Sequence, residues 1–119
     1  MFEKLEKYAT HFSEQIKNEC NHLDSVVVAG KILSIIPPIT DDIKLLSSHY
    51  ILELDDHVGT IFIFVSPMMK SNFDFIEVGN YLTFNGYVNV LLRKIKDDYK
   101  KDYSIVAFDA AVLDIKEAS

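Results

Sequence analysis

Beyond Asp24 the sequence is a series of short runs rich in β-branched and aromatic residues, and turn-forming residues separate them. Such runs favour β-strands, because branched and aromatic side chains pack well on a pleated surface. Five strands are predicted, over residues 25–36, 49–54, 60–65, 80–92 and 103–115. Pro37 and Pro67 follow two of these runs closely. The connector 68–78 has room for a short helix, and the charged segment 93–102 is predicted to be a loop.

Residues 1–23 hold a different pattern, in which apolar residues recur every three or four positions. This spacing places them on one side of a helix. We therefore predict one amphipathic helix that ends near Asn21, followed by a single β domain over residues 24–119. Two roles are open for the apolar side: it packs on its own domain, or it docks on another protein. The apolar positions are Phe2, Leu5, Ala9, Phe12, Ile16 and Leu23.

Length and composition fit one domain with a real core, because 49% of the 119 residues are hydrophobic. No apolar run reaches the roughly 18 residues of a membrane span. The charged N-terminus MFEKLEKYATHF lacks the apolar stretch of a signal peptide. Cys20 is the one cysteine, which excludes a disulfide framework and a cysteine metal cluster. We expect a cytoplasmic protein with no membrane partner.

The segment LELDDHVGTIFIFV, residues 52–65, places two acids and a histidine between two alternating apolar runs. Asp55, Asp56 and His57 are open to two interpretations: a metal or acid–base site, or the turn of a β-hairpin. Gly59 can adopt positive φ at no steric cost, and Asp side chains stabilise turns by bonding nearby backbone. A metal site would need further ligands, and the other histidines show no ligand spacing. The pattern therefore favours a hairpin turn without metal.

Four short motifs, each with one glycine, occur in order along the predicted strands. They are VAGKI at 28–32, LDDHVGTI at 54–61, VGNYL at 78–82 and GYV at 86–88. Their order, and that of the five strands, resembles the OB-fold nucleic-acid-binding family. This family includes single-stranded DNA-binding subunits such as replication protein A and the anticodon-binding domains of some tRNA synthetases. The resemblance covers about residues 25–115. It implies a mainly β protein, a five-stranded OB-fold Greek-key barrel, with the N-terminal amphipathic α-helix outside it.

Alternation along each strand assigns side chains to the inside or the outside of such a barrel. The positions predicted to face inward are Val28, Ile32, Leu52, Leu54, Ile61, Ile63, Val65, Leu82, Phe84 and Val88. Those predicted to face outward are Lys31, Ile51, Glu53, Phe62, Phe64, Thr83, Asn85 and Tyr87. Gly30 and Gly86 fall inside strands, where a small barrel bends sharply, so their role is predicted to be structural.

Phe62 and Phe64 are large apolar residues on a face that alternation predicts to be wet, and such a patch needs an explanation. Three are open: the rings stack on nucleic-acid bases, another part of the chain covers them, or a protein partner does. The resemblance favours the first, because OB domains bind oligonucleotides on the face of strands two and three.

The segment RKIKDDYKKDY, residues 93–103, is the one cationic concentration in a chain of net charge −6. In OB proteins the corresponding loop is a wall of the binding groove. Its Lys and Arg residues could pair with phosphates while a tyrosine stacks on a base. The alternative is an ordinary solvated segment, whose three aspartates cancel most of the charge. The net charge itself argues against broad electrostatic capture of nucleic acid.

The sequence contains no nucleophile elbow, P-loop, dinucleotide fingerprint or paired metal motif, so we expect neither an enzyme nor a cofactor. The predicted function is single-stranded nucleic-acid binding, DNA more than RNA, as an accessory protein in replication or repair. The alternative is an interaction subunit that docks on a larger replication enzyme such as a DNA polymerase or primase. Abundant Ile, Lys and Asn point to an AT-rich bacterial or mobile-element genome. The candidate binding residues are Lys31, Phe62, Phe64, Tyr87, Arg93, Lys94, Lys96, Tyr99, Lys100 and Lys101.

Overall fold

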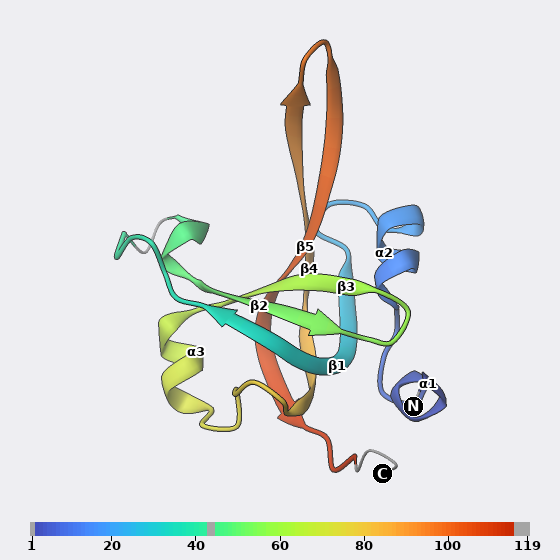
Figure 1. Ribbon diagram of the computed structural model, residues 1–119, viewed down its shortest axis with the longest axis vertical. Helices are drawn as coiled ribbons and strands as arrows, with labels where there is room; N and C mark the ends of the chain where they lie inside the picture. The colour runs from blue at the N-terminus through green and yellow to red at the C-terminus, as the bar shows by residue number, and fades with distance from the viewer. Residues whose placement is uncertain (1, 43–44, 116–119) are drawn as a thin grey trace.

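The computed structural model describes residues 2–42 and 45–115, and Figure 1 shows a β-barrel from which one long hairpin projects. The strands of the described chain are β1 (Ser25–Ile36), β2 (Tyr50–Asp55), β3 (Thr60–Val65), β4 (Tyr81–Ile95) and β5 (Asp98–Val112). They close into a ring in the order β1-β2-β3-β5-β4. Neighbours are antiparallel except for β3 and β5, which run parallel. The mainly β, five-stranded OB-like barrel that the sequence predicts is confirmed.

Local sequence signals place β1, β2 and β3 to within one residue, whereas β4 ends three residues after its predicted end and β5 begins five residues and ends three residues before its predicted bounds. β1 and β3 coincide with their predicted ranges, and β2 is shifted by one residue. The short helix expected in the connector is α3 (Pro67–Asn72). Its N-cap is Ser66, whose hydroxyl oxygen accepts a hydrogen bond of 3.1 Å from the backbone nitrogen of Met69. Such a serine cap satisfies one of the free N–H groups in the first helical turn.

The core lies inside the barrel and consists of the side chains that alternation points inward. All ten predicted inward residues are buried, and the eight predicted outward ones are exposed or half-buried. Phe84 is the largest fully buried side chain. Burying a side chain of this kind contributes about 1.5–3 kcal/mol relative to leaving it in water. The alternating pattern therefore both sets the register of the strands and supplies the main stabilising term.

Two glycines permit the close approach of neighbouring backbones. β1 pairs with β4 through residues 25–31 and with β2 from Lys31 onward, so it bends around Gly30. A Cβ atom at Gly30 would collide with the backbone carbonyl of Asp55, and one at Gly86 would collide with that of Val106. Gly86 also lies at an irregularity in the pairing of β4 with β5. These contacts support the structural role predicted for both glycines.

The prediction of one continuous helix over residues 1–23 is wrong, because the structure has two short helices, α1 (Phe2–Glu6) and α2 (Ser13–Glu19). Between them the chain pairs with β1 at Thr10. The Thr10 nitrogen donates to the Val27 carbonyl at 2.8 Å, and the Val27 nitrogen donates to the Thr10 hydroxyl oxygen, also at 2.8 Å. Because the Thr10 N–H donates to β1, it cannot also donate within a helix, so the helix is interrupted there.

The apolar side of this N-terminal segment packs on the barrel at two points. Leu5 and Ile16 are both fully buried. Ile16 belongs to the main core, whereas Leu5 forms a smaller cluster with Phe12, Ala29 and Tyr81. For Leu5 and Ile16 the first of the two predicted roles, packing on the chain's own domain, is therefore the correct one. No helix of the described residues is long and apolar enough to cross a membrane.

The prediction that residues 93–102 form a loop is also wrong. β4 and β5 stay paired beyond the barrel, from Leu91 opposite Asp102 to Ile95 opposite Asp98. Lys96 has a positive φ of 55° in the turn between them. We call residues 91–102 the ribbon, and Figure 1 shows it projecting from the barrel. Both of its faces are wet, so charged side chains are compatible with strand structure there.

Candidate nucleic-acid interface

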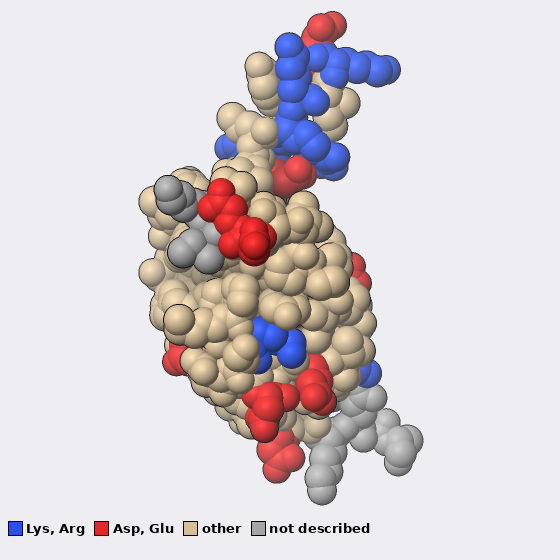
Figure 2. Space-filling view, turned by 90° about the vertical axis from the view of Figure 1, so that its left-hand side faces the viewer, with Lys and Arg blue, Asp and Glu red and all other residues tan. Residues whose placement is uncertain are grey.

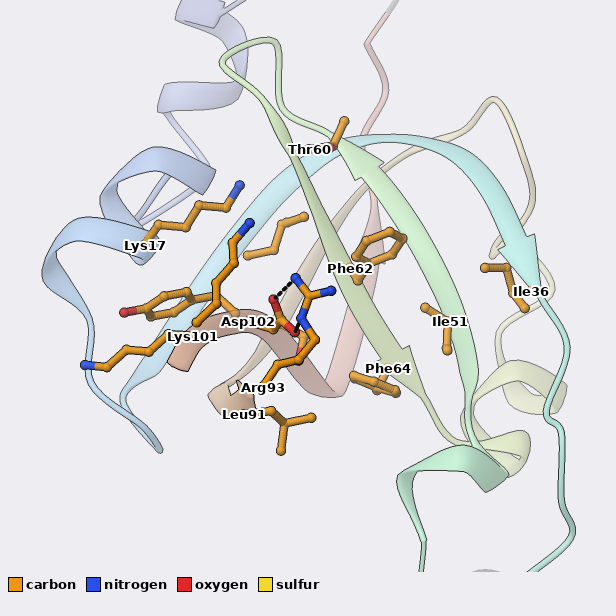
Figure 3. Close-up of a pocket in the computed structure, with 14 residues that line it drawn as sticks. Lys17, Ile36, Ile51, Thr60, Phe62, Phe64, Leu91, Arg93, Lys101 and Asp102 are labelled. Atoms are coloured by element: carbon orange, nitrogen blue, oxygen red, sulfur yellow. Dashed lines mark hydrogen bonds and ion pairs between the residues drawn. The ribbon is translucent and has the colours of Figure 1, made fainter. Parts of the chain in front are cut away.

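A groove of about 750 Å³ lies between the outer face of β2 and β3 and the base of the ribbon (Figure 3). Its floor is largely apolar and comes from the end of β1 and from the two paired strands. Its opposite wall comes from β4 and β5 and carries most of the charge. The floor residues are Ile36, Ile51, Thr60, Ile61, Phe62 and Phe64, and the wall residues are Leu91, Arg93, Lys100, Lys101, Asp102, Tyr103 and Ser104.

Two aromatic rings dominate the floor. Phe62 and Phe64 are two positions apart on β3, so both point to the outer face. The Phe62 side chain is 43% exposed, whereas Phe64 is half-buried beside His49, with the ring centroids 6.4 Å apart and the planes at 80°. The interpretation that the chain covers both rings is therefore wrong for Phe62. An exposed ring in a groove is a surface on which a flat apolar group can stack.

The ribbon supplies a basic wall. Residues 93–102 hold five basic and three acidic residues, a formal charge of +2 within a chain of −6. Figure 2 shows Lys and Arg side chains gathered on the projecting ribbon. Arg93 pairs with Asp102, since its Nε lies 3.2 Å from Oδ2 and its Nη2 donates to Oδ1 at 3.4 Å. Lys100 lies opposite Arg93 in the strand register. Part of the cationic charge at the wall is thus neutralised within the protein.

Helix α2 contributes a cation that sequence reasoning missed. Lys17 lines the groove, and Figure 3 shows its side chain extending from α2 on the side of Lys101. In the sequence Lys17 falls on the polar side of an expected helix, where a lysine is ordinary. No local pattern indicates where that helix lies against the barrel, so the sequence contains no signal for this residue.

Asp56 fixes the position of α2. Its carboxylate is 3% exposed and accepts hydrogen bonds at 2.9 and 2.8 Å from the backbone nitrogens of Val58 and Gly59. It also accepts bonds at 2.6 Å from the Ser13 nitrogen and at 3.2 Å from the Ser13 hydroxyl. Ser13 is the first residue of α2. One buried side chain therefore closes the β2–β3 turn and binds the free N–H at the start of a helix.

The hairpin turn predicted at Asp55, Asp56 and His57 is confirmed, but the positive φ expected at Gly59 is found at His57 instead, at 69°. The Asp56 nitrogen donates to the Gly59 carbonyl at 3.1 Å, and the His57 nitrogen donates to the Asp55 carboxylate at 2.8 Å. The His57 ring lies parallel to that of Tyr81, with centroids 6.2 Å apart. Within the described ranges no cluster of three or more His, Cys, Asp or Glu side chains is arranged to hold a metal ion. That the turn binds no metal in solution stays a prediction.

The structure brings five of the ten predicted binding residues into the groove: Phe62, Phe64, Arg93, Lys100 and Lys101. The other five lie outside it. Lys31 is at the bend of β1, and Tyr87 is half-buried on the barrel wall opposite Ser25. Lys94 and Tyr99 are cross-strand partners one position out of phase with Arg93 and Lys100, so they occupy the opposite ribbon face. Lys96 is in the turn at the tip of the ribbon.

Cys20 is not suited to nucleophilic chemistry. The residue is buried at the end of α2, and this burial raises the pKa of its thiol, with smaller contributions from the negative charges of Asp24 and Glu19. A raised pKa reduces the thiolate fraction at neutral pH, and the thiolate is the reactive form.

No protein-family model matches the chain, and no curated protein matches it. Solved structures do match. An OBody bound to hen egg-white lysozyme has 15% identity and a TM-score of 0.63, over 88% of this chain and 94% of that chain. The S. cerevisiae mitochondrial single-stranded DNA binding protein Rim1 has 13% identity and a TM-score of 0.59, over 81% of this chain and 99% of that chain. At such identities the likeness shows a shared OB-like fold.

Proposed function

We propose that this protein binds single-stranded nucleic acid, DNA in preference to RNA, in the groove between β3 and the ribbon. It would act as an accessory protein in replication or repair, without catalysing a reaction itself. One observation carries the proposal: an exposed aromatic floor faces a basic wall across one groove. The likeness in fold to Rim1, a mitochondrial single-stranded DNA binding protein, supports DNA as the strand.

The two sides of the groove match the two parts of a nucleotide. A base that stacks on an aromatic ring contributes about 1–3 kcal/mol, and stacking is tolerant of sequence. Lys17, Lys100 and Lys101 stand at the groove edge and would pair with phosphates. Their charge acts locally, so the net charge of −6 weakens binding without abolishing it. We expect weak to moderate affinity with a clear dependence on salt.

Fluorescence anisotropy with labelled oligo-dT at two salt concentrations tests this function. Phe62→Ala should weaken binding by about 1–3 kcal/mol with little change in the salt slope, because it removes stacking and no phosphate contact. Phe108→Ala is the matched control, since Phe108 is 65% exposed on β5 and does not line the groove. Equal losses for the two variants would argue against stacking in the groove.

The charged wall is tested separately. Replacing Lys100 and Lys101 together with Ala should flatten the salt slope by about 0.7 for each phosphate contact removed, the value for single strands. The stacking and charge variants therefore give different signatures in one assay. If the wild-type protein does not bind oligo-dT at low salt, either alone or together with a copurifying partner, the proposed function is refuted.

A second function, docking on a larger replication enzyme such as a polymerase or primase, is favoured by the other face of the ribbon. Leu92 and Tyr99 lie there with 65% and 63% of their surfaces exposed. Large apolar side chains on an exposed face are typical of protein interaction sites. An OBody bound to lysozyme is an example of an OB-like protein that binds another protein. Leu92 is the cross-strand partner of Lys101, which lines the groove, whereas Tyr99 lies further along the ribbon and outside the groove, so one chain could guide a strand while it contacts its enzyme.

This docking function predicts a separable variant. Tyr99→Ser should weaken association with a copurifying replication enzyme and leave oligo-dT binding within about twofold of wild type, because Tyr99 lies on the outer ribbon face and does not line the groove. Phe62→Ala should weaken oligo-dT binding and leave association with the enzyme unchanged. Binding of oligo-dT only in the presence of the enzyme would show that the groove is completed by the partner.

A further inference from the structure

Arg93 is the one arginine of the chain, and it lines the proposed binding groove in an ion pair with another groove residue, Asp102. We propose that Asp102 limits the affinity of the groove for nucleic acid, because it holds Arg93 in an internal pair that a phosphate must displace. This inference rests on the proposed function. Removing the charge of the Asp102 carboxylate should therefore raise the affinity of the groove for nucleic acid.

The geometry of the pair explains the competition. Nε and Nη2 of Arg93 face the two oxygens of Asp102, at 3.2 and 3.4 Å. These two atoms form one edge of the guanidinium fork, the arrangement that binds carboxylate and phosphate alike in a bidentate manner. With Asp102 on that edge, a phosphate can bind it only by replacing the carboxylate. A phosphate that approaches elsewhere meets an ion pair of zero net charge and is repelled by the nearby carboxylate.

The pair is easily opened, so its effect falls on binding more than on folding. The side chains of Arg93 and Asp102 are 55% and 47% exposed. Exposed ion pairs contribute little to stability, because solvent and salt screen them. Asp102 therefore competes with a phosphate without locking the arginine permanently. A strand that binds would also have to release easily, which suits a protein that passes a strand to an enzyme.

The other groove cations are not restrained in this way. Lys17, Lys100 and Lys101 make no ion pair with any described residue. In the free protein they carry counterions that a phosphate releases, whereas Arg93 already has an internal partner. Neutralising Asp102 should therefore add Arg93 to the set of cations that respond to salt.

The central experiment compares oligo-dT binding by wild type and Asp102→Asn across a salt series. Asp102→Asn should bind about three- to tenfold more tightly at low salt, with a slope steeper by about 0.7, because one more cation meets a phosphate. The matched control is Asp97→Asn, which removes the same charge from the ribbon turn, away from the groove residues. It should change affinity by less than about twofold, because exposed charges at a distance are screened.

The double variant Arg93→Gln with Asp102→Asn shows whether the effect passes through Arg93. Arg93→Gln should remove most of the gain that Asp102→Asn produces in the wild-type background. An equal gain from Asp97→Asn, a gain retained in the Arg93→Gln background, or weaker binding by Asp102→Asn would each overturn the role of Asp102. Failure of every variant to bind would instead refute the proposed function itself. Equal thermal midpoints by circular dichroism would show that the variants remain folded.

Discussion

At the scale of single residues, Asp56 links two parts of the chain that are distant in sequence. It joins Ser13 to a turn 43 positions later in the chain, and its carboxylate accepts four hydrogen bonds while almost fully buried. A buried charge is costly unless hydrogen bonds compensate it, and here backbone N–H groups and a hydroxyl do so. Asp56 therefore helps to place α2, and with it Lys17, together with Ile16, which is buried in the core.

Asp56→Ala should therefore lower the free energy of unfolding by about 1–3 kcal/mol, because it leaves buried N–H donors without acceptors. Urea denaturation measures the change. Asp55→Ala is the control at the neighbouring position, where the carboxylate accepts one bond, from the His57 nitrogen. We expect it to cost under about 1 kcal/mol. Similar losses in both variants would contradict the special role of Asp56.

The same residue shows how far sequence reasoning reaches at this scale. An Asp before a glycine at a turn is recognisable, because its bonds to Val58 and Gly59 are local. The bond to Ser13 depends on tertiary structure, and no pattern within a few residues of Asp56 indicates it. The turn could therefore be predicted, whereas its connection to α2 could not.

At the scale of elements, strands were predictable where one face is buried and unpredictable where both are wet. Ile61, Ile63 and Val65 alternate with outward residues, so β3 was placed without error. Beyond Leu91 the ribbon has no buried face, and its charged residues give no alternation to detect. Pairing there continues the register of β4 and β5 from the barrel and ends at the turn that contains Lys96.

Helix α2 gives a prediction of its own, because it brings a cation to the groove from outside the barrel. Lys17→Gln should weaken oligo-dT binding and flatten the salt slope by about 0.7, one phosphate contact on a single strand. Lys7→Gln is the control, since Lys7 is exposed after α1 and does not line the groove. An unchanged slope in Lys17→Gln would place the strand away from α2.

At the scale of the whole molecule, charge is divided unevenly. Residues 93–102 carry +2 and the chain carries −6, so the rest of the sequence carries −8. Figure 2 shows Lys and Arg concentrated on the ribbon and acidic groups spread over the barrel. A polyanion is therefore attracted at the groove and repelled by the remaining surface. Under the proposed function, this division would confine binding to a short length of strand, within the roughly 4–16 nucleotides typical of one OB-fold.

The division of charge also predicts selectivity for single strands. A duplex keeps its bases stacked inside, so Phe62 has no base face to contact, and the second strand brings more phosphates against an acidic barrel. We expect a duplex to bind at least about tenfold more weakly than oligo-dT of the same length, since it loses stacking worth about 1–3 kcal/mol per base. Competition of unlabelled duplex against labelled oligo-dT measures the ratio.

Phe62→Ala should reduce the preference for single strands, because it weakens single-strand binding alone. Replacing Lys100 and Lys101 should weaken the binding of both ligands and leave the ratio of their affinities nearly unchanged. If the wild-type protein binds both equally, phosphate contacts alone account for its affinity, and the aromatic floor of the groove serves another ligand.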